Sequence, residues 1–293
     1  MLVMLPRLVD PSAMLVARGG WLAMTALFVV ADYLLRNTSA HWHTVLVKDL
    51  TEVLRTVGQL AWLIIWYPDT YEFNRSFNNL DHLFAAADQS IFGCQPSIEF
   101  SQALPSHFWS EAFNLGYWSY YPMIAILVLV VLWKQRSAFQ PVATEIITSF
   151  FIFYVVFIFL PVAGPQFYFH AIGIPDDITA SFPALGTYFS SHLEALSPPG
   201  WTDGFFYQLV ASAQETGERP TAAFPSSHVG VSTIVMILAR RHAPRLLYLF
   251  IPLWILLCCA TVYIRAHYFV DAVGGLIAAP LVLWAAAAIA KRF

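Results

Sequence analysis

The chain has 293 residues, of which 58% are hydrophobic and 11% are charged, with a formal net charge of −3. Soluble domains carry about 25% charged residues, so the composition disfavours a soluble protein, and the acidic balance does not suggest nucleic-acid binding. The three cysteines, Cys94, Cys258 and Cys259, have no metal-ligand spacing, and their odd number does not make a disulfide framework.

Six apolar runs predict membrane helices. All but the fourth are near the length of about 20 residues that a bilayer core requires. The fourth reaches that length only if its helix begins at Ser226. Arg7, Arg18 and a cleavage-like Thr38–Ala40 make the first run similar to a signal peptide, but we expect an uncleaved anchor. The runs are Met14–Leu35, Ala112–Trp133, Val142–Val162, Val229–Ala239, Leu246–Ile264 and Phe269–Ala290.

The segment Leu46–Trp66 is amphipathic. Its polar residues recur at helical spacing and form one stripe, which favours an interfacial helix lying along the membrane surface. The alternative is a further span, which would place the N-terminus on the other side. The stripe consists of Lys48, Glu52, Arg55 and Gln59.

Basic residues fall at run ends that alternate to one side, and the positive-inside rule makes that side cytoplasmic. The connection Ala163–Phe224 is then extracytoplasmic, and it is acidic and rich in Pro and Gly. Within it, Gly204–Ala213 predicts a short helix capped by Asp203. The basic residues are Lys134, Arg136, Arg240, Arg241, Arg245, Lys291 and Arg292.

The stretch Ala222–Gly230 (AAFPSSHVG) places a proline, two hydroxyls and a histidine at the start of the fourth run. Pro225 prevents helical hydrogen bonding further upstream, and Ser226 or Ser227 is a favourable N-cap. A helix that begins here points free N–H groups and the positive end of its dipole outward, which suits phosphate. We predict a phosphate cradle with His228 in its first turn; the alternative is an ordinary helix cap.

The stretch Thr261–Gly275 (TVYIRAHYFVDAVGG) leads from the outer end of one run into the next. His267 and Asp271 are four residues apart, so they share a face if both lie on a helix. Asp271 can accept from one imidazole nitrogen, which leaves the other free as a nucleophile. The alternative is a structural pair joining two helices. By the orientation above, His267 lies on the same side as the phosphate cradle.

FPSSH followed by HYFVD resembles two signature motifs of the type-2 phosphatidic acid phosphatase (lipid phosphate phosphatase) superfamily, Pro-Ser-Gly-His and Ser-Arg-x5-His-x3-Asp. DQSIFGCQPS (Asp88–Ser97) and GPQFY (Gly164–Tyr168) resemble segments of its inositolphosphotransferase branch, which includes inositol phosphorylceramide synthases. The resemblance covers Asp88–Pro280. It implies an all-α, polytopic membrane helix bundle of about six transmembrane helices, with the site at one membrane face. We expect residues 1–87 to form the anchor and interfacial helices, and residues 88–293 the catalytic core.

Carried over to this sequence, the resemblance implies that His267 is the nucleophile, Asp271 its orienting partner and His228 the general acid. Ser226 and Ser227 would contact the phosphate. A zinc site built on the histidine and aspartate pair lacks a third ligand, so we expect no metal and no cofactor.

The sequence departs from the family pattern at three positions. Ser227 replaces a glycine, Thr261 replaces the arginine six residues before the nucleophile, and Ser212 stands where the first motif has lysine. Arg219 and Arg265 are the available substitutes as phosphate ligands. Arg265 is two residues before His267, so it can serve only if the helix starts after it; its alternative is an interfacial anchor. Arg219 is favoured because it is the only cation in an acidic loop beside the cradle; its alternative is a solvated charge paired with a neighbouring glutamate.

The resemblance implies an enzyme acting on a lipid phosphate ester through a phosphohistidine, leaning to transfer of a phospho-head-group onto a lipid alcohol. Gln166 and Tyr168 would contact the head group. A phosphatase with water as acceptor is one alternative, and a proton-coupled transporter is an alternative of a different class. The expected partners are the bilayer, a phospholipid substrate and an acceptor, in a bacterial inner membrane with the site on the periplasmic side.

Overall fold

The computed structural model describes residues 11–36, 41–174 and 181–291, so Arg7, Thr38–Ala40 and Arg292 lie outside the described residues. All regular elements of the described chain are helices. The chain divides into two compact units, Met1–Phe73 and Asn74–Phe293.

The first unit is an antiparallel helical hairpin of α1 (Pro11–Arg36) and α2 (His41–Asn74), whose last residue belongs to the second unit. Arg18 donates to Asp69 at 2.6 Å, and the Trp21 indole donates to Gln59 at 3.2 Å. The amphipathic segment predicted over Leu46–Trp66 is part of the longer α2. Among the described residues, neither helix is long and apolar enough to count as a membrane span, and α1 has only a shorter apolar stretch.

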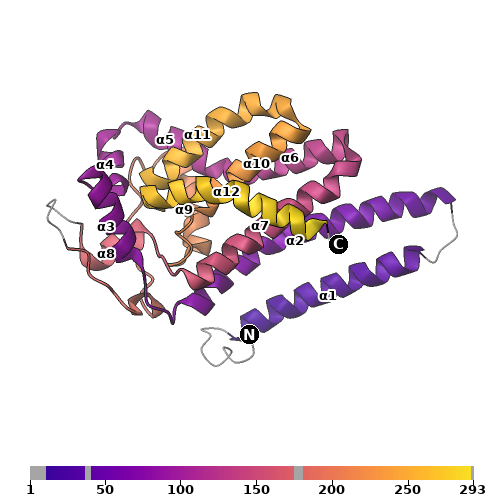
Figure 1. Ribbon diagram of the computed structural model, residues 1–293, viewed down its shortest axis with the longest axis horizontal. Coiled ribbons are helices and arrows are strands. Elements are labelled where there is room, and N and C mark those ends of the chain that lie inside the picture. The colour runs from indigo at the N-terminus through magenta and orange to yellow at the C-terminus, as the bar shows by residue number, and fades with distance from the viewer. Residues whose placement is uncertain (1–10, 37–40, 175–180, 292–293) are drawn as a thin grey trace. The chain divides into compact units, whose positions relative to one another are not determined.

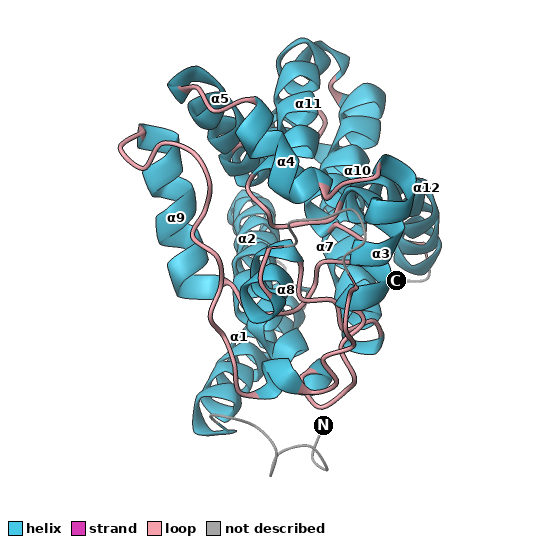
Figure 2. Cartoon of the chain, turned by 90° about the vertical axis from the view of Figure 1, so that its left-hand side faces the viewer, coloured by secondary structure: helices cyan, strands magenta, loops and turns pink. Residues whose placement is uncertain are grey.

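The second unit holds the remaining helices (Figures 1 and 2). In chain order they are α3 (Asp81–Phe92), α4 (Pro96–Ala103), α5 (His107–Trp118), α6 (Tyr120–Lys134), α7 (Arg136–Phe159), α8 (Pro165–Ile172), η2 (Tyr188–Ser190), α9 (Phe205–Gly217), α10 (Ser227–His242), η3 (Pro244–Leu246), α11 (Leu247–Tyr263) and α12 (Phe269–Ala290).

Three helical segments of the described chain are long and apolar enough to cross a membrane: Arg136–Phe159, Pro244–Tyr263 and Phe269–Ala290. The run predicted as one helix over Ala112–Trp133 is instead α5 and α6, bent by 44° at their junction, and this pair counts as a fourth span if taken together. Pro122 explains the bend, because it lacks the N–H that would bond to the carbonyl four residues earlier and its ring crowds that carbonyl.

The two ends of the second unit differ in character. At one end, Gln135 donates to the His242 carbonyl at 2.9 Å, so the α6–α7 turn lies beside the end of α10. Arg241 and Lys291 lie within electrostatic reach of Glu145 there. The basic run ends therefore gather together, as their alternation predicts. The short helices α3, α4 and α8 lie at the other end, toward the left in Figure 1 and facing the viewer in Figure 2.

The short helix predicted over Gly204–Ala213 is present as α9, but the expected cap by Asp203 is wrong. Gly204 is the N-cap residue and provides no side-chain bond. Glu111 of α5 supplies the acceptor instead, because its carboxylate takes the N–H groups of Phe206 and Tyr207, both at 2.9 Å. The cap therefore comes from a distant helix and not from the residue beside α9.

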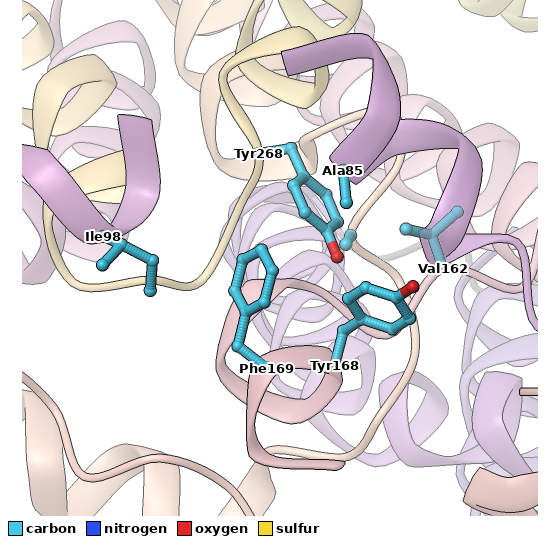
Figure 3. Close-up of a cluster of buried hydrophobic side chains, with 7 residues drawn as sticks. Ala85, Ile98, Val162, Tyr168, Phe169 and Tyr268 are labelled. Carbon is cyan, nitrogen blue, oxygen red and sulfur yellow. The ribbon is translucent and has the colours of Figure 1, made fainter. Parts of the chain in front are cut away.

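A buried hydrophobic cluster, called the aromatic cluster here for its rings of Tyr168, Phe169 and Tyr268, lies between α3, α8 and the loop before α12 (Figure 3). Tyr268 extends from that loop toward Tyr168 and Phe169 of α8, and its ring centroid lies 6.3 Å from that of Phe169. Burying a side chain of this size stabilises the fold by about 1.5–3 kcal/mol. The cluster thus fixes the chain immediately after His267.

Candidate active site

The start of α10 has the local structure that its sequence predicts. Ser226 is the N-cap, and its hydroxyl accepts from the Val229 N–H at 3.3 Å. The N–H of Ser226 donates to the Asp271 carbonyl at 3.0 Å, which ties the start of α10 to the first turn of α12. The N–H groups of Ser227 and His228 belong to the first helical turn, which has no upstream carbonyl to bond. The start of α10 therefore carries backbone N–H groups without helical partners, which is the kind of group that can bind an anion.

Helices α10 and α12 approach closely at two glycines. A Cβ atom built on Gly275 would lie 2.5 Å from the Ser226 carbonyl oxygen and 3.2 Å from the Gly230 nitrogen. Only glycine at position 275 permits this approach. The contact sets the distance between the start of α10 and the segment that precedes α12.

His267 lies before α12 and not on it, so the expectation that it shares a helical face with Asp271 is wrong. Helix α12 begins at Phe269. Arg265 has φ of +67°, a left-handed conformation that turns the chain after α11 and that non-glycine residues rarely adopt. The His267 N–H donates to the Thr261 carbonyl at 3.0 Å, which closes this turn.

The hydrogen bond of the His267 ring also differs from the expectation. Nδ1 lies 2.8 Å from the Ala223 carbonyl oxygen but 3.7 Å from the Asp271 carboxylate. A carbonyl can only accept, so Nδ1 carries the proton and Nε2 keeps its lone pair. Asp271 accepts from the Tyr268 N–H at 2.9 Å and caps α12. A main-chain carbonyl therefore sets the tautomer, and the fully buried carboxylate lies just beyond it.

His228 and His267 lie side by side, with ring centroids 5.8 Å apart in an edge-on arrangement. Tyr117 stacks on the His228 ring with centroids 4.5 Å apart, and Tyr120 lies 4.7 Å from it. These tyrosines flank the break between α5 and α6, and sequence reasoning missed them because no spacing connects them to His228. Among the described residues, His228 Nδ1 is buried without a hydrogen-bond partner.

Burial lowers the pKa of His267 to about 4, and the hydrogen bond to Ala223 opposes that shift. The imidazole is therefore neutral over the physiological pH range. A neutral ring with a fixed Nδ1 proton is the form in which Nε2 can attack an electrophile.

The two candidate arginines both lie outside regular helix. Arg219 is half-buried and donates to the Glu218 main-chain carbonyl at 2.9 Å, which is a bond to the backbone and not to a carboxylate. Arg265 donates weakly to the Ser197 carbonyl at 3.5 Å. Its Nε is buried and has no hydrogen-bond partner among the described residues, and burial lowers its pKa. Because α12 starts after it, Arg265 is not confined to the far side of a helix from His267.

The two expected head-group residues have different surroundings. Tyr168 is fully buried in the aromatic cluster, and its hydroxyl donates to the Pro183 carbonyl at 2.9 Å, so the group expected to contact the head group has a partner within the protein. Gln166 lies against the turn before His267, because its N–H donates to the Arg265 carbonyl at 3.0 Å. Its side chain lies beside Glu218, whose pKa burial raises to about 7.

Two buried aspartates of α3 escaped the sequence reasoning. Asp81 accepts from the N–H groups of Ala163 and Gly164 and from the Tyr268 hydroxyl, at 2.6, 2.8 and 2.9 Å. Asp88 accepts from the first two N–H groups of α12, at 2.8 and 3.1 Å. Asp88 opens one of the segments that carried the resemblance, but nothing in the sequence connected it to α12.

The described geometry thus brings together a neutral imidazole with a free Nε2 lone pair, a second imidazole and the N-terminus of α10. Within the described part of the chain, no group of three or more His, Cys, Asp or Glu residues is placed to hold a metal ion. A family model described as the PAP2 superfamily matches residues 83–285. Neither a protein of curated function nor a solved structure matches the chain.

Proposed function

Because the chain belongs to the PAP2 superfamily, whose enzymes are generally phosphatases of lipid phosphates, we propose that it cleaves a lipid phosphate ester in the membrane through a phosphohistidine at His267. The observation that carries this proposal is the 5.8 Å separation of the His228 and His267 rings at the N-terminus of α10. A nucleophile approaches within about 3–3.5 Å of its target and a general acid within about 3 Å of its own. A single phosphate can therefore meet both rings at once.

In the first half-reaction, Nε2 of His267 attacks phosphorus and the ester P–O bond breaks on the opposite side. His228 gives its proton to the departing alkoxide, and the negative phosphate beside the ring favours the protonated form that this step requires. Such proton transfer contributes about 10²–10⁴-fold to the rate. As Nε2 becomes bonded, the ring gains positive charge, which the Asp271 carboxylate at 3.7 Å stabilises.

In the second half-reaction, a hydroxyl or water attacks the phosphohistidine and gives its proton to His228. The P–N bond breaks, and both histidines return to their starting state. In this scheme, protein groups alone stabilise the negative charge on the phosphate oxygens. The first-turn N–H groups of α10 and the Ser227 hydroxyl face the equatorial oxygens, since the Ser226 hydroxyl is engaged as the cap. Arg265 is the preferred cation for the phosphate, because its Nε is buried and has no hydrogen-bond partner among the described residues.

We further propose that the acceptor is a lipid alcohol, which would place the chain with the inositolphosphotransferase branch; water is the alternative acceptor. Support comes from the two segments that resemble that branch, since both contact the nucleophile's surroundings. Asp88 binds the start of α12, and the N–H of Gln166 binds the Arg265 carbonyl. If the resemblance were accidental, we would not expect both segments to contact the residues around His267.

The same proposal covers the arrangement in the membrane. It takes α7, α11, α12 and the bent α5–α6 pair as spans, and adds α10 and the shorter apolar stretch of α1 to reach about six. Residues 1–87 are then an anchor unit and residues 88–293 the core. The gathered basic ends would face the cytoplasm, so the histidine pair would open on the opposite side, in a bacterial inner membrane facing the periplasm.

Purified protein in liposomes with ³²P-labelled long-chain phosphatidic acid tests the proposal, with and without a short-chain diacylglycerol as acceptor, so that label transferred to the acceptor gives a product that differs from the substrate. We expect acid-labile label on the wild-type protein, none on His267→Ala, and turnover of His228→Ala reduced by about 10²–10⁴-fold. Release of free phosphate without diacylglycerol would favour the phosphatase, and label passed only to diacylglycerol would favour the transferase. Absence of turnover in the wild type, together with a proton flux that His267→Ala abolishes, would identify a transporter instead.

A further inference from the structure

Helix α3 carries two buried carboxylates on one face. Asp81 and Asp88 are seven residues apart, two helical turns, so their side chains lie on the same side of α3. Both are fully buried. Buried carboxylates are costly unless donors satisfy them, so the identity of their donors indicates what they hold in place.

Asp88 holds the first turn of α12 from outside that helix. Its two oxygens accept from the N–H groups of Phe269 and Val270, at 2.8 and 3.1 Å. These groups have no partner within α12, and a negative charge at a helix N-terminus is favourable. Asp88 therefore fixes where α12 begins, two residues after His267.

Asp81 holds the other side of the same segment. It accepts from the Tyr268 hydroxyl and from the N–H groups of Ala163 and Gly164. Gly164 in turn lies directly against the residue before His267, since a Cβ built on it would be 2.7 Å from the Ala266 carbonyl oxygen. The Asp81 carboxylate thus connects Tyr268, which follows His267, with Gly164, whose backbone packs against Ala266, which precedes His267.

The acceptor of the His267 ring belongs to the same network. The Ala223 N–H donates to the Val162 carbonyl at 3.0 Å, next to the N–H groups that Asp81 holds. The Ala223 carbonyl then accepts from Nδ1 of His267. The ring orientation, the tautomer and the main chain on both sides of His267 therefore all depend on positions that α3 fixes.

We propose that Asp81 and Asp88 are positioning residues for His267, through which α3 sets the line of attack of Nε2. This inference rests on the proposed function. Neither carboxylate touches the substrate. Loosening them lowers the rate of phosphohistidine formation and leaves substrate binding largely unchanged, because the phosphate contacts at the start of α10 do not involve either carboxylate.

Tyr268→Phe tests the proposal with little disturbance, since it removes only the hydroxyl that bonds Asp81 and keeps the ring in its cluster. Its matched control is Tyr263→Phe, which removes a buried hydroxyl bonded to the Leu104 carbonyl at 3.1 Å. Both variants lose a buried hydroxyl and keep the ring, so thermal melts of the two show whether a change in kcat follows from lost stability alone. For Tyr268→Phe we expect kcat to fall by about tenfold with KM within about twofold, since about 1 Å of misplacement can cost 10²-fold. Tyr263→Phe should keep kcat within about twofold.

A second pair of variants keeps the test decisive if Tyr268→Phe does not fold. Asp88→Asn weakens the cap of α12, and Glu111→Gln weakens the analogous cap of α9, where one carboxylate also takes two main-chain N–H groups. Single-turnover formation of phosphohistidine should slow in Asp88→Asn and not in Glu111→Gln.

Equal kcat values within each pair, or a rise in KM that accounts for the whole loss, would overturn the positioning role while leaving the proposed function intact. A wild-type protein without turnover, or a fully active His267→Ala variant, would instead overturn the proposed function and this inference with it.

Discussion

The contact between α10 and α12 at Gly275 offers a quantitative test of the histidine pair. In Gly275→Ala, the new Cβ would start 2.5 Å from the Ser226 carbonyl oxygen. Close C···O contacts in proteins lie at about 3.3–3.6 Å, so the two helices must separate by about 0.8–1.1 Å. The atom that obstructs the methyl group belongs to the main chain, and therefore no side-chain rotation relieves the clash.

The separation acts on the start of α10, where His228 and the first-turn N–H groups lie. A misplacement of about 1 Å costs about 10²-fold in rate, which corresponds to about 2.7 kcal/mol of transition-state stabilisation. Overpacking of this kind lowers the free energy of unfolding by about 1–3 kcal/mol, which a typical folded protein can lose and remain folded. We expect folded protein with kcat/KM about 10²-fold lower.

The assay is turnover of a short-chain lipid phosphate in detergent micelles, with thermal unfolding measured on the same preparations. Gly19→Ala is the control, because that helical glycine has nothing within 4 Å of a built Cβ. It should leave turnover unchanged. A folded Gly275→Ala variant with wild-type kcat/KM would refute the reasoning, since the pair would then tolerate the separation that the contact imposes.

Three further predictions concern the charges at the site. Because burial lowers the pKa of His267 from its ordinary value of 6.5 to about 4, kcat/KM should fall with decreasing pH only near pH 4. A fall near pH 6.5 would mean that water reaches the ring. Since the unfolded chain takes up that proton at higher pH than the folded chain, His267 should make the protein lose stability as the pH falls from about 6.5 to 4, in thermal melts that His267→Gln would flatten. Arg265→Ala should raise the inhibition constant for vanadate more than Arg219→Ala does, and the reverse order would assign the phosphate to Arg219.

Local signals in the sequence predicted the helix starts at the site. Pro225 and Ser226 mark the beginning of α10, which starts at Ser227 with Ser226 as its cap. The last apolar run coincides with α12, Phe269–Ala290. Such boundaries depend on the residues next to them, and for that reason one chain segment suffices to predict them.

The partners of the site residues were not predictable in the same way. Spacing alone suggested that Asp271 holds His267, but the left-handed Arg265 turns the chain and α12 starts two residues after the histidine. The acceptor that holds the ring is the Ala223 carbonyl, and a main-chain carbonyl has no sequence signature. Asp88 lies 181 residues from Phe269, which it caps, and no periodicity connects residues so distant.

The two supports of the histidine pair should not act independently, and a double-mutant cycle measures their coupling. Gly275→Ala displaces the start of α10 and therefore His228, whereas Tyr268→Phe loosens the segment that carries His267. If the rate depends on the relative placement of the two rings, the second displacement acts on a pair that is already out of line. The double variant should then lose less than the product of the single losses, which is about 10³-fold, with a coupling of about 0.5–3 kcal/mol. Losses that multiply fully would show that the substitutions affect separate steps, and the separation of His228 and His267 would not be the quantity that limits the chemistry.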